Sequence, residues 1–195
     1  MALGRFSSNG NREWSYDVFP CPIDLCEMLL DITMLYKTQL DGSSPSRETV
    51  EQAKCITNLL ENWRYSHDCL GPREHMIEAW RFGIMVYLRR LFPSAVQSPD
   101  VAALTSRVLH HAGLIPRGTS WSYALLWPLF QAGVCLNERA LDEKAWIRRH
   151  LEFALGAVGC RHFSNALETL EFVWHSNVEN LSCFGNTFGR TIMLG

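Results

Sequence analysis

Histidine and cysteine are the residues of this chain that could hold a metal ion or carry out acid–base and nucleophilic chemistry. Metal ligands must converge on one point, which on a helix requires a His-x-x-x-His or His-Glu-x-x-His spacing. No pair of histidines has that spacing, and the adjacent His110 and His111 would point about 100° apart on a helix. We therefore expect surface or helix-capping roles, and no metal site, for His67, His75, His110, His111, His150, His162 and His175.

The cysteines form no Cys-x-x-Cys pair, and their number is odd. Their scatter through helical patterns predicts buried, reduced thiols in a reducing compartment. They are Cys21, Cys26, Cys55, Cys69, Cys135, Cys160 and Cys183.

Other catalytic signatures are also missing from the sequence. It has no Gly-x-Ser-x-Gly elbow and neither of the common glycine-rich phosphate loops. Glu168 and Glu171 share a helical face, but paired acids on an amphipathic helix are usually its solvated side. We expect no catalytic residue and no cofactor, although a site assembled across helices would leave no linear signature.

Composition indicates one globular domain that does not bind nucleic acid. The 195 residues are 47% hydrophobic, with seven Trp and ten Phe, which is enough to build a core. Lys and Arg total 18 against 20 Asp and Glu, whereas nucleic-acid-binding modules are normally basic. The densest basic spots, Arg89-Arg90 and Arg148-Arg149, are too small for a phosphate-binding surface. Residues 1–14 lack the apolar core of a secretory signal.

Apolar periodicity predicts an all-α fold of about seven helices in an antiparallel hairpin or bundle-like array, with no strand. Residues 1–16 are expected to be a mobile arm, residues 17–195 the helical domain, and residues 181–195 a loop with a short final helix. The first helix should bury one face formed by Ile23, Cys26, Leu29 or Leu30, Thr33 and Tyr36 or Lys37. The expected helices cover about residues 22–42, 46–63, 74–91, 98–112, 121–136, 142–155 and 161–177.

Two helix starts have recognisable chemistry. Ser46 is a plausible N-cap for the second helix. Ser98-Pro99-Asp100 predicts a serine cap, a proline in the first turn and an acid near the positive end of the helix dipole.

The segment from Leu125 to Gly133 is almost wholly apolar and should form the buried central helix. The apolar run from Trp121 to Leu136 is shorter than the ~20 residues that cross a bilayer, so we expect no membrane span. Pro128 should free a backbone carbonyl and bend the helix, opening room beside Trp127 and Gly133.

Three segments then resemble a known family. They are Leu-Leu-Trp-Pro-Leu-Phe-x-Ala-Gly (125–133), Trp-Ile-Arg-Arg-His-Leu (146–151) and Ala-Leu-Glu-Thr-Leu-Glu-Phe-Val-Trp (166–174). Together with the segment from Asp17 to Tyr36, they resemble the fungal-specific transcription factor domain, in particular the second of its two sequence types. This regulatory region lies downstream of a Zn2Cys6 DNA-reading cluster in fungal regulators. The resemblance spans about residues 17–195 and implies transcriptional regulation in the nucleus.

The chain departs from that family at the zinc cluster. Cys21 and Cys26 are the only close pair, their spacing does not match the cluster, and no basic residues adjoin them. We therefore expect no DNA binding by this chain itself. It would be a fragment, a truncated product or a free-standing regulatory half, with other regulators, coactivators or a second copy as partners.

An apolar pocket is the remaining site hypothesis. Some members of the resembled family sense small hydrophobic molecules such as sterols through this half, and the pocket residues would be Trp80, Trp127, Phe130 and Gly133. Alternatively, the aromatic rings simply fill the core. Rival functions are a small helical enzyme, an apolar-ligand carrier, or a dominant-negative partner of full-length regulators.

Overall fold

The computed structural model describes residues 21–38, 45–65, 71–93 and 100–176, and within these ranges it contains eight α-helices and no strand. The predicted all-α fold is confirmed. The expected arm at residues 1–16 and the expected final segment at 181–195 lie outside the described residues. The helices are α2 (Ile23–Lys37), α3 (Arg47–Asn62), α4 (Pro72–Leu91), α5 (Val101–Gly113), α6 (Ser120–Tyr123), α7 (Leu126–Val134), α8 (Leu141–Val158) and α9 (Arg161–His175).

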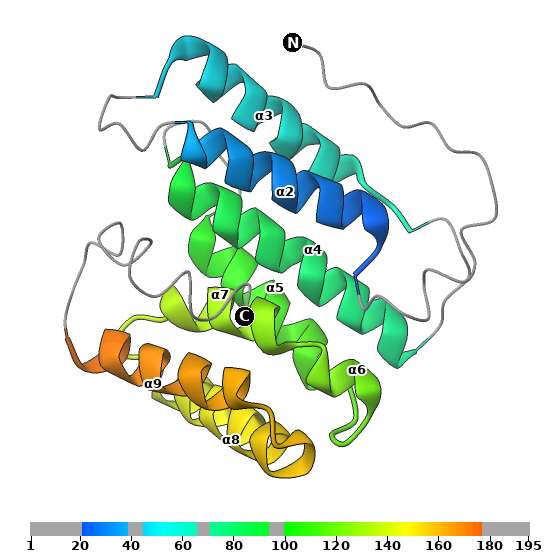
Figure 1. Cartoon of the computed structure of the whole chain (residues 1–195), viewed down its shortest axis with the longest axis vertical. Coiled ribbons are helices and arrows are strands. Elements are labelled where there is room, and N and C mark those ends of the chain that lie inside the picture. Colours follow the sequence, from blue (N-terminus) through cyan, green and yellow to red (C-terminus); the bar gives the residue numbers. More distant parts are fainter. Residues whose placement is uncertain (1–20, 39–44, 66–70, 94–99, 177–195) are drawn as a thin grey trace.

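Helix α4 lies between the N-terminal hairpin and the rest of the molecule. In Figure 1, α2 and α3 cover one side of α4, α5 and α7 cover the other, and α8 and α9 form the far layer. Ten residues of α4 are buried, so this helix belongs to the core although two arginines lie in its last turn. The buried centre is thus shared between α4 and α7, whereas the sequence predicted the segment around Pro128 alone.

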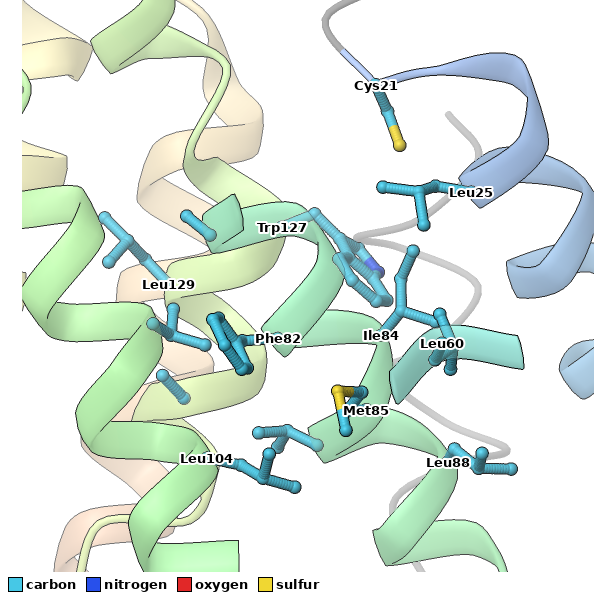
Figure 2. Packing of buried hydrophobic residues seen from close by; sticks show 14 of the residues in the cluster. Cys21, Leu25, Leu60, Phe82, Ile84, Met85, Leu88, Leu104, Trp127 and Leu129 are labelled. Carbon is cyan, nitrogen blue, oxygen red and sulfur yellow. The ribbon is translucent and has the colours of Figure 1, made fainter. Parts of the chain in front are cut away.

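Two hydrophobic clusters meet at α7. The larger cluster gathers buried side chains from α2, α3, α4, α5 and α7, several of which are labelled in Figure 2. The smaller cluster consists mainly of α8 and α9 packed on the last turn of α7. Leu129 and Ala132 belong to the first cluster and Val134 to the second, so this short helix connects the two.

The buried face of α2 matches the predicted one only in part, since Cys26, Leu29 and Tyr36 pack against the core but are not its fully buried residues. Leu25 and Ile32 are fully buried, whereas Leu30 is 60% exposed and Ile23 and Cys26 are only partly buried. Apolar residues occur around most of this helix, so their spacing alone does not select one face. The choice is made by packing against α3 and α4.

The two predicted helix starts have different outcomes. The Ser46 cap is confirmed, because its hydroxyl accepts a hydrogen bond from the backbone N–H of Thr49 at 3.1 Å. At the fourth predicted helix, Asp100 is itself the N-cap and the helix begins at Val101. The predicted start was therefore too early, and Ser98 and Pro99 lie outside the described residues.

The single helix predicted for residues 121–136 is divided into α6 and α7. A turn at Ala124 and Leu125 separates them, and α7 begins two residues before Pro128. Proline has no N–H, and its ring is tolerated in the first helical turn, where the N–H groups lack intrahelical partners. The break therefore falls one turn before the proline, where the sequence predicted only a bend.

Candidate functional site

An aromatic junction, formed by Trp80 and Tyr87 of α4 and Trp127 of α7, holds the two central helices together. The rings of Trp80 and Trp127 stack with centroids 5.2 Å apart and planes 11° apart. Tyr87 meets the same Trp127 ring edge-on, at 5.8 Å and 72°. Both geometries are favourable for aromatic pairs. One indole ring of α7 thus lies between two aromatic side chains of α4.

Gly83 allows the close approach of the helices at this junction. A Cβ at this position would lie 3.2 Å from Pro128 Cα and 3.3 Å from the Trp127 ring. Nine in ten real Cβ contacts are longer, so a side chain at residue 83 would require Pro128 or Trp127 to shift by a few tenths of an ångström. The glycine therefore permits the close helix approach at which Trp80 stacks on Trp127.

The carbonyl that Pro128 frees is the acceptor of the junction's hydrogen bond. In an uninterrupted helix, the Ala124 carbonyl would accept the N–H of residue 128, which proline lacks. The Trp80 indole Nε1–H donates to this Ala124 oxygen at 3.0 Å instead. The predicted freed carbonyl is thus present, and a side chain from another helix satisfies it.

The four residues of the predicted apolar pocket divide between the two clusters. Trp80 and Trp127 are stacked in the junction, whereas Phe130 packs on the smaller cluster. A Cβ on Gly133 would lie 2.8 Å from Leu170 Cδ2, so α9 approaches α7 closely there. A ligand site formed by all four residues remains a prediction, while Trp80 and Trp127 are the pair that the structure brings together.

Polar side chains attach the α8–α9 layer to α6 and α7. The Trp174 Nε1–H donates to the Gly133 carbonyl at 2.8 Å. Within the layer, Arg148 Nε donates to Glu171 Oε1 at 2.6 Å. Glu168 is exposed and the Glu171 side chain is 38% exposed, as expected for the solvated side of the helix, and Glu171 also links α9 to α8 through this surface ion pair.

His150 has a structural role that its sequence context does not reveal. It is 3% exposed, and its Nε2–H donates to the Ser122 carbonyl of α6 at 3.1 Å. Burial lowers the pKa of this imidazole below its usual 6.5. The expected surface or capping role is therefore wrong for this histidine.

His75 and His111 meet across the α4–α5 interface. Their Nδ1 atoms are 3.2 Å apart, so one ring donates to the other. Burial lowers the pKa of His111. Linear spacing could not find this pair, because it joins residues far apart in sequence. Within the described ranges, no group of three His, Cys, Asp or Glu side chains is placed to hold a metal ion.

The cysteines are only partly as predicted. Cys21 is buried, but Cys55 is exposed, since α3 turns it to solvent. Cys21 lies just before the N-cap residue Pro22, and Cys26 is the fourth residue of α2. Side chains at these two positions of a helix commonly contact each other. Their contact lowers the pKa of Cys26, and burial raises that of Cys21. Cys69 and Cys183 lie outside the described residues.

The comparisons with known proteins identify the family. The model of the fungal-specific transcription factor domain matches residues 12–185, which is nearly the whole chain. The chain therefore belongs to this family of fungal transcription factor domains, and the predicted resemblance is confirmed. Neither the curated proteins nor the solved structures gave a match. Among the described residues, none of the helices is long and apolar enough to span a membrane.

The Trp80 hydrogen bond leads to a first prediction. Trp80→Phe should destabilise the fold by about 1–3 kcal/mol, because the Ala124 carbonyl loses its donor. In a Pro128→Ala background the same change should cost less, since residue 128 then has an N–H of its own to offer. Urea unfolding of the four proteins in this double-mutant cycle measures the coupling. If Trp80→Phe lowered the free energy of unfolding equally in both backgrounds, the Trp80 indole would not be replacing the N–H that Pro128 lacks.

A second prediction concerns pH. The lowered pKa values of His150 and His111 mean that the unfolded chain binds protons before the folded one does. Stability should be complete above about pH 6.5 and fall as the pH drops, by at most ~1.4 kcal/mol per pH unit for each group. His150→Gln keeps a donor for Ser122 and should flatten this dependence in urea titrations at pH 7.5, 6.5 and 5.5. An unchanged slope would contradict the assignment to His150.

Proposed function

We propose that this chain is the regulatory body of a fungal transcription regulator, acting in the nucleus through contacts with other proteins. The observation that carries the proposal is the family match, which spans all eight described helices. Its partners would be other regulators, coactivators or a second copy of the chain. Neither the sequence nor the family match assigns a DNA-reading element to this chain, so its effect on transcription would be indirect.

Exposed apolar side chains support action through protein contacts. Leu30 and Met34 lie one turn apart on α2 and are 60% and 52% exposed. Leu59, on the neighbouring α3, is similarly exposed. Single exposed apolar residues are common on proteins, but a pair on one helical face is a typical anchor for a partner helix. We therefore assign partner contact first to the α2 surface.

A small hydrophobic effector is the second part of the proposal. Its position would be the aromatic junction, where Trp80 and Tyr87 are only partly buried around the Trp127 ring. A ligand that bound there would change how α4 packs on α7. Because α7 contributes to both clusters, such a change would alter the packing of both the larger and the smaller cluster.

The proposed function can be tested by tethering. The chain, fused to an unrelated DNA-binding module in a yeast reporter strain, should change reporter transcription, because it brings its partners to the promoter. Leu30→Ser with Met34→Ser should reduce the change, whereas the control Leu141→Ser, at a 70% exposed position on another helix, should not. A folded, nuclear fusion that left transcription unchanged would overturn the regulatory role. Melting temperatures against sterols and lipids test the effector separately.

A further inference from the structure

Two free thiols, those of Cys21 and Cys26, lie against each other at the start of α2. The Cys26 S–H donates to the Cys21 carbonyl oxygen at 3.7 Å. The two side chains also share a hydrogen bond, in which the Cys21 thiol donates to the Cys26 sulfur. The Cys26 sulfur is therefore in contact with the residue to which a disulfide would join it.

The positions of the two cysteines explain this contact. Cys21 directly precedes the N-cap residue Pro22, and Cys26 is the fourth residue of the helix. Side chains at these two positions commonly pack together and fix the angle at which the chain enters the helix. Here both members of the pair are cysteine. The contact that fixes the entry into α2 is thus one that oxidation can make covalent.

The two thiols differ in their access to solvent. Cys21 is 3% exposed and belongs to the larger hydrophobic cluster, and Figure 2 shows its sulfur pointing toward Leu25. Cys26 is only half-buried. A reagent from solvent can therefore reach the Cys26 sulfur first. The pair consists of an outer thiol, Cys26, and an inner thiol, Cys21.

The outer thiol is also the better nucleophile. The hydrogen bond from Cys21 lowers the pKa of the Cys26 thiol, whereas burial raises the pKa of the Cys21 thiol. The thiolate, and not the thiol, attacks a disulfide sulfur. Access and acidity therefore assign the same roles, with Cys26 as the attacking residue and Cys21 as the resolving residue.

We propose that Cys21 and Cys26 form a reversible oxidation site, which glutathione disulfide or a similar small disulfide converts to an intramolecular disulfide. Cys26 Sγ attacks one sulfur of the small disulfide, so that a mixed disulfide forms and one glutathione leaves. Cys21 Sγ then attacks the Cys26 sulfur, which forms the Cys21–Cys26 bond and releases the second glutathione. The protein loses two electrons and two protons, and the small disulfide takes them up as two thiols.

Oxidation at this site acts on the helix that presents the exposed pair Leu30 and Met34. The disulfide closes a ring over the first turn of α2 and holds its start in one conformation. In a reducing compartment such bonds are transient, which suits a redox sensor rather than a structural crosslink. An effect on partner contact rests on the proposed function, whereas the oxidation itself stands on the two thiols.

Mass spectrometry of the full chain tests the site. The chain is incubated with about 1 mM each of oxidised and reduced glutathione, and the remaining thiols are blocked with N-ethylmaleimide. Cleavage on the N-terminal side of each aspartate leaves residues 17–23 and 24–30 as separate peptides. The Cys21–Cys26 disulfide should join these two peptides, and excess dithiothreitol should separate them.

Three variants test the order of the two steps. Cys21→Ala keeps the buried position apolar but removes the resolving thiol, so glutathione on Cys26 should increase by about tenfold or more. Cys26→Ala removes the attacking thiol and should leave Cys21 unmodified, because its sulfur is buried. The control Cys55→Ala removes an exposed thiol of α3 and should form the Cys21–Cys26 disulfide as the natural chain does.

The proposal would be overturned if the two peptides were not joined in the natural chain. It would also be overturned if Cys26 formed disulfides with other cysteines as often as with Cys21, since pairing would then not follow from the contact. No increase of glutathione on Cys26 in Cys21→Ala would contradict the attacking role of Cys26. Equal glutathione uptake by Cys21 in Cys26→Ala would contradict the distinction between the inner and the outer thiol.

Discussion

The packing of α7 against α4 is the constraint on which the rest of the structure depends. Pro128 and Trp127 of α7 lie against Gly83, and the absence of a side chain there allows the approach. Proline also frees the Ala124 carbonyl, and the Trp80 indole satisfies it at the same interface. Steric, aromatic and polar requirements are therefore met by one contact. If this contact loosens, the smaller cluster loses the helix on which it is built.

The second half of the molecule is attached through backbone carbonyls of α6 and α7. The Ser122 carbonyl accepts from His150, and the Gly133 carbonyl accepts from Trp174. In both cases a buried or half-buried ring donates to a backbone oxygen of a neighbouring helix. Such bonds are costly to break without replacement, because the orphaned carbonyl stays away from water. They fix the orientation of α8 and α9 on α7 more narrowly than apolar contact alone would.

The helices and the residues at their ends could be predicted from the sequence, because they depend on neighbours in the chain. Helix periodicity predicted the all-α fold. Ser46 predicted the start of α3, and Pro128 predicted a backbone carbonyl without its intrahelical donor. The partners of these groups could not be predicted, because nothing in the spacing of Trp80 and Ala124, or of Arg90 and Gln131, links residues so far apart. The face of α2 was predicted only in part for a related reason: a helix that is apolar on most sides is oriented by its neighbours. Of the candidate pocket, the sequence identified the two tryptophans that stack on each other.

Helix α7 contributes to both clusters, and we expect it to join them into one cooperative unit. Native-state amide hydrogen exchange in increasing urea measures this most directly, because it gives an opening free energy for each helix. Amides of α4, α7 and α9 should converge on one global unfolding free energy. Exchange of α8 and α9 through a separate opening of lower free energy, with α4 and α7 still protected, would contradict the claim.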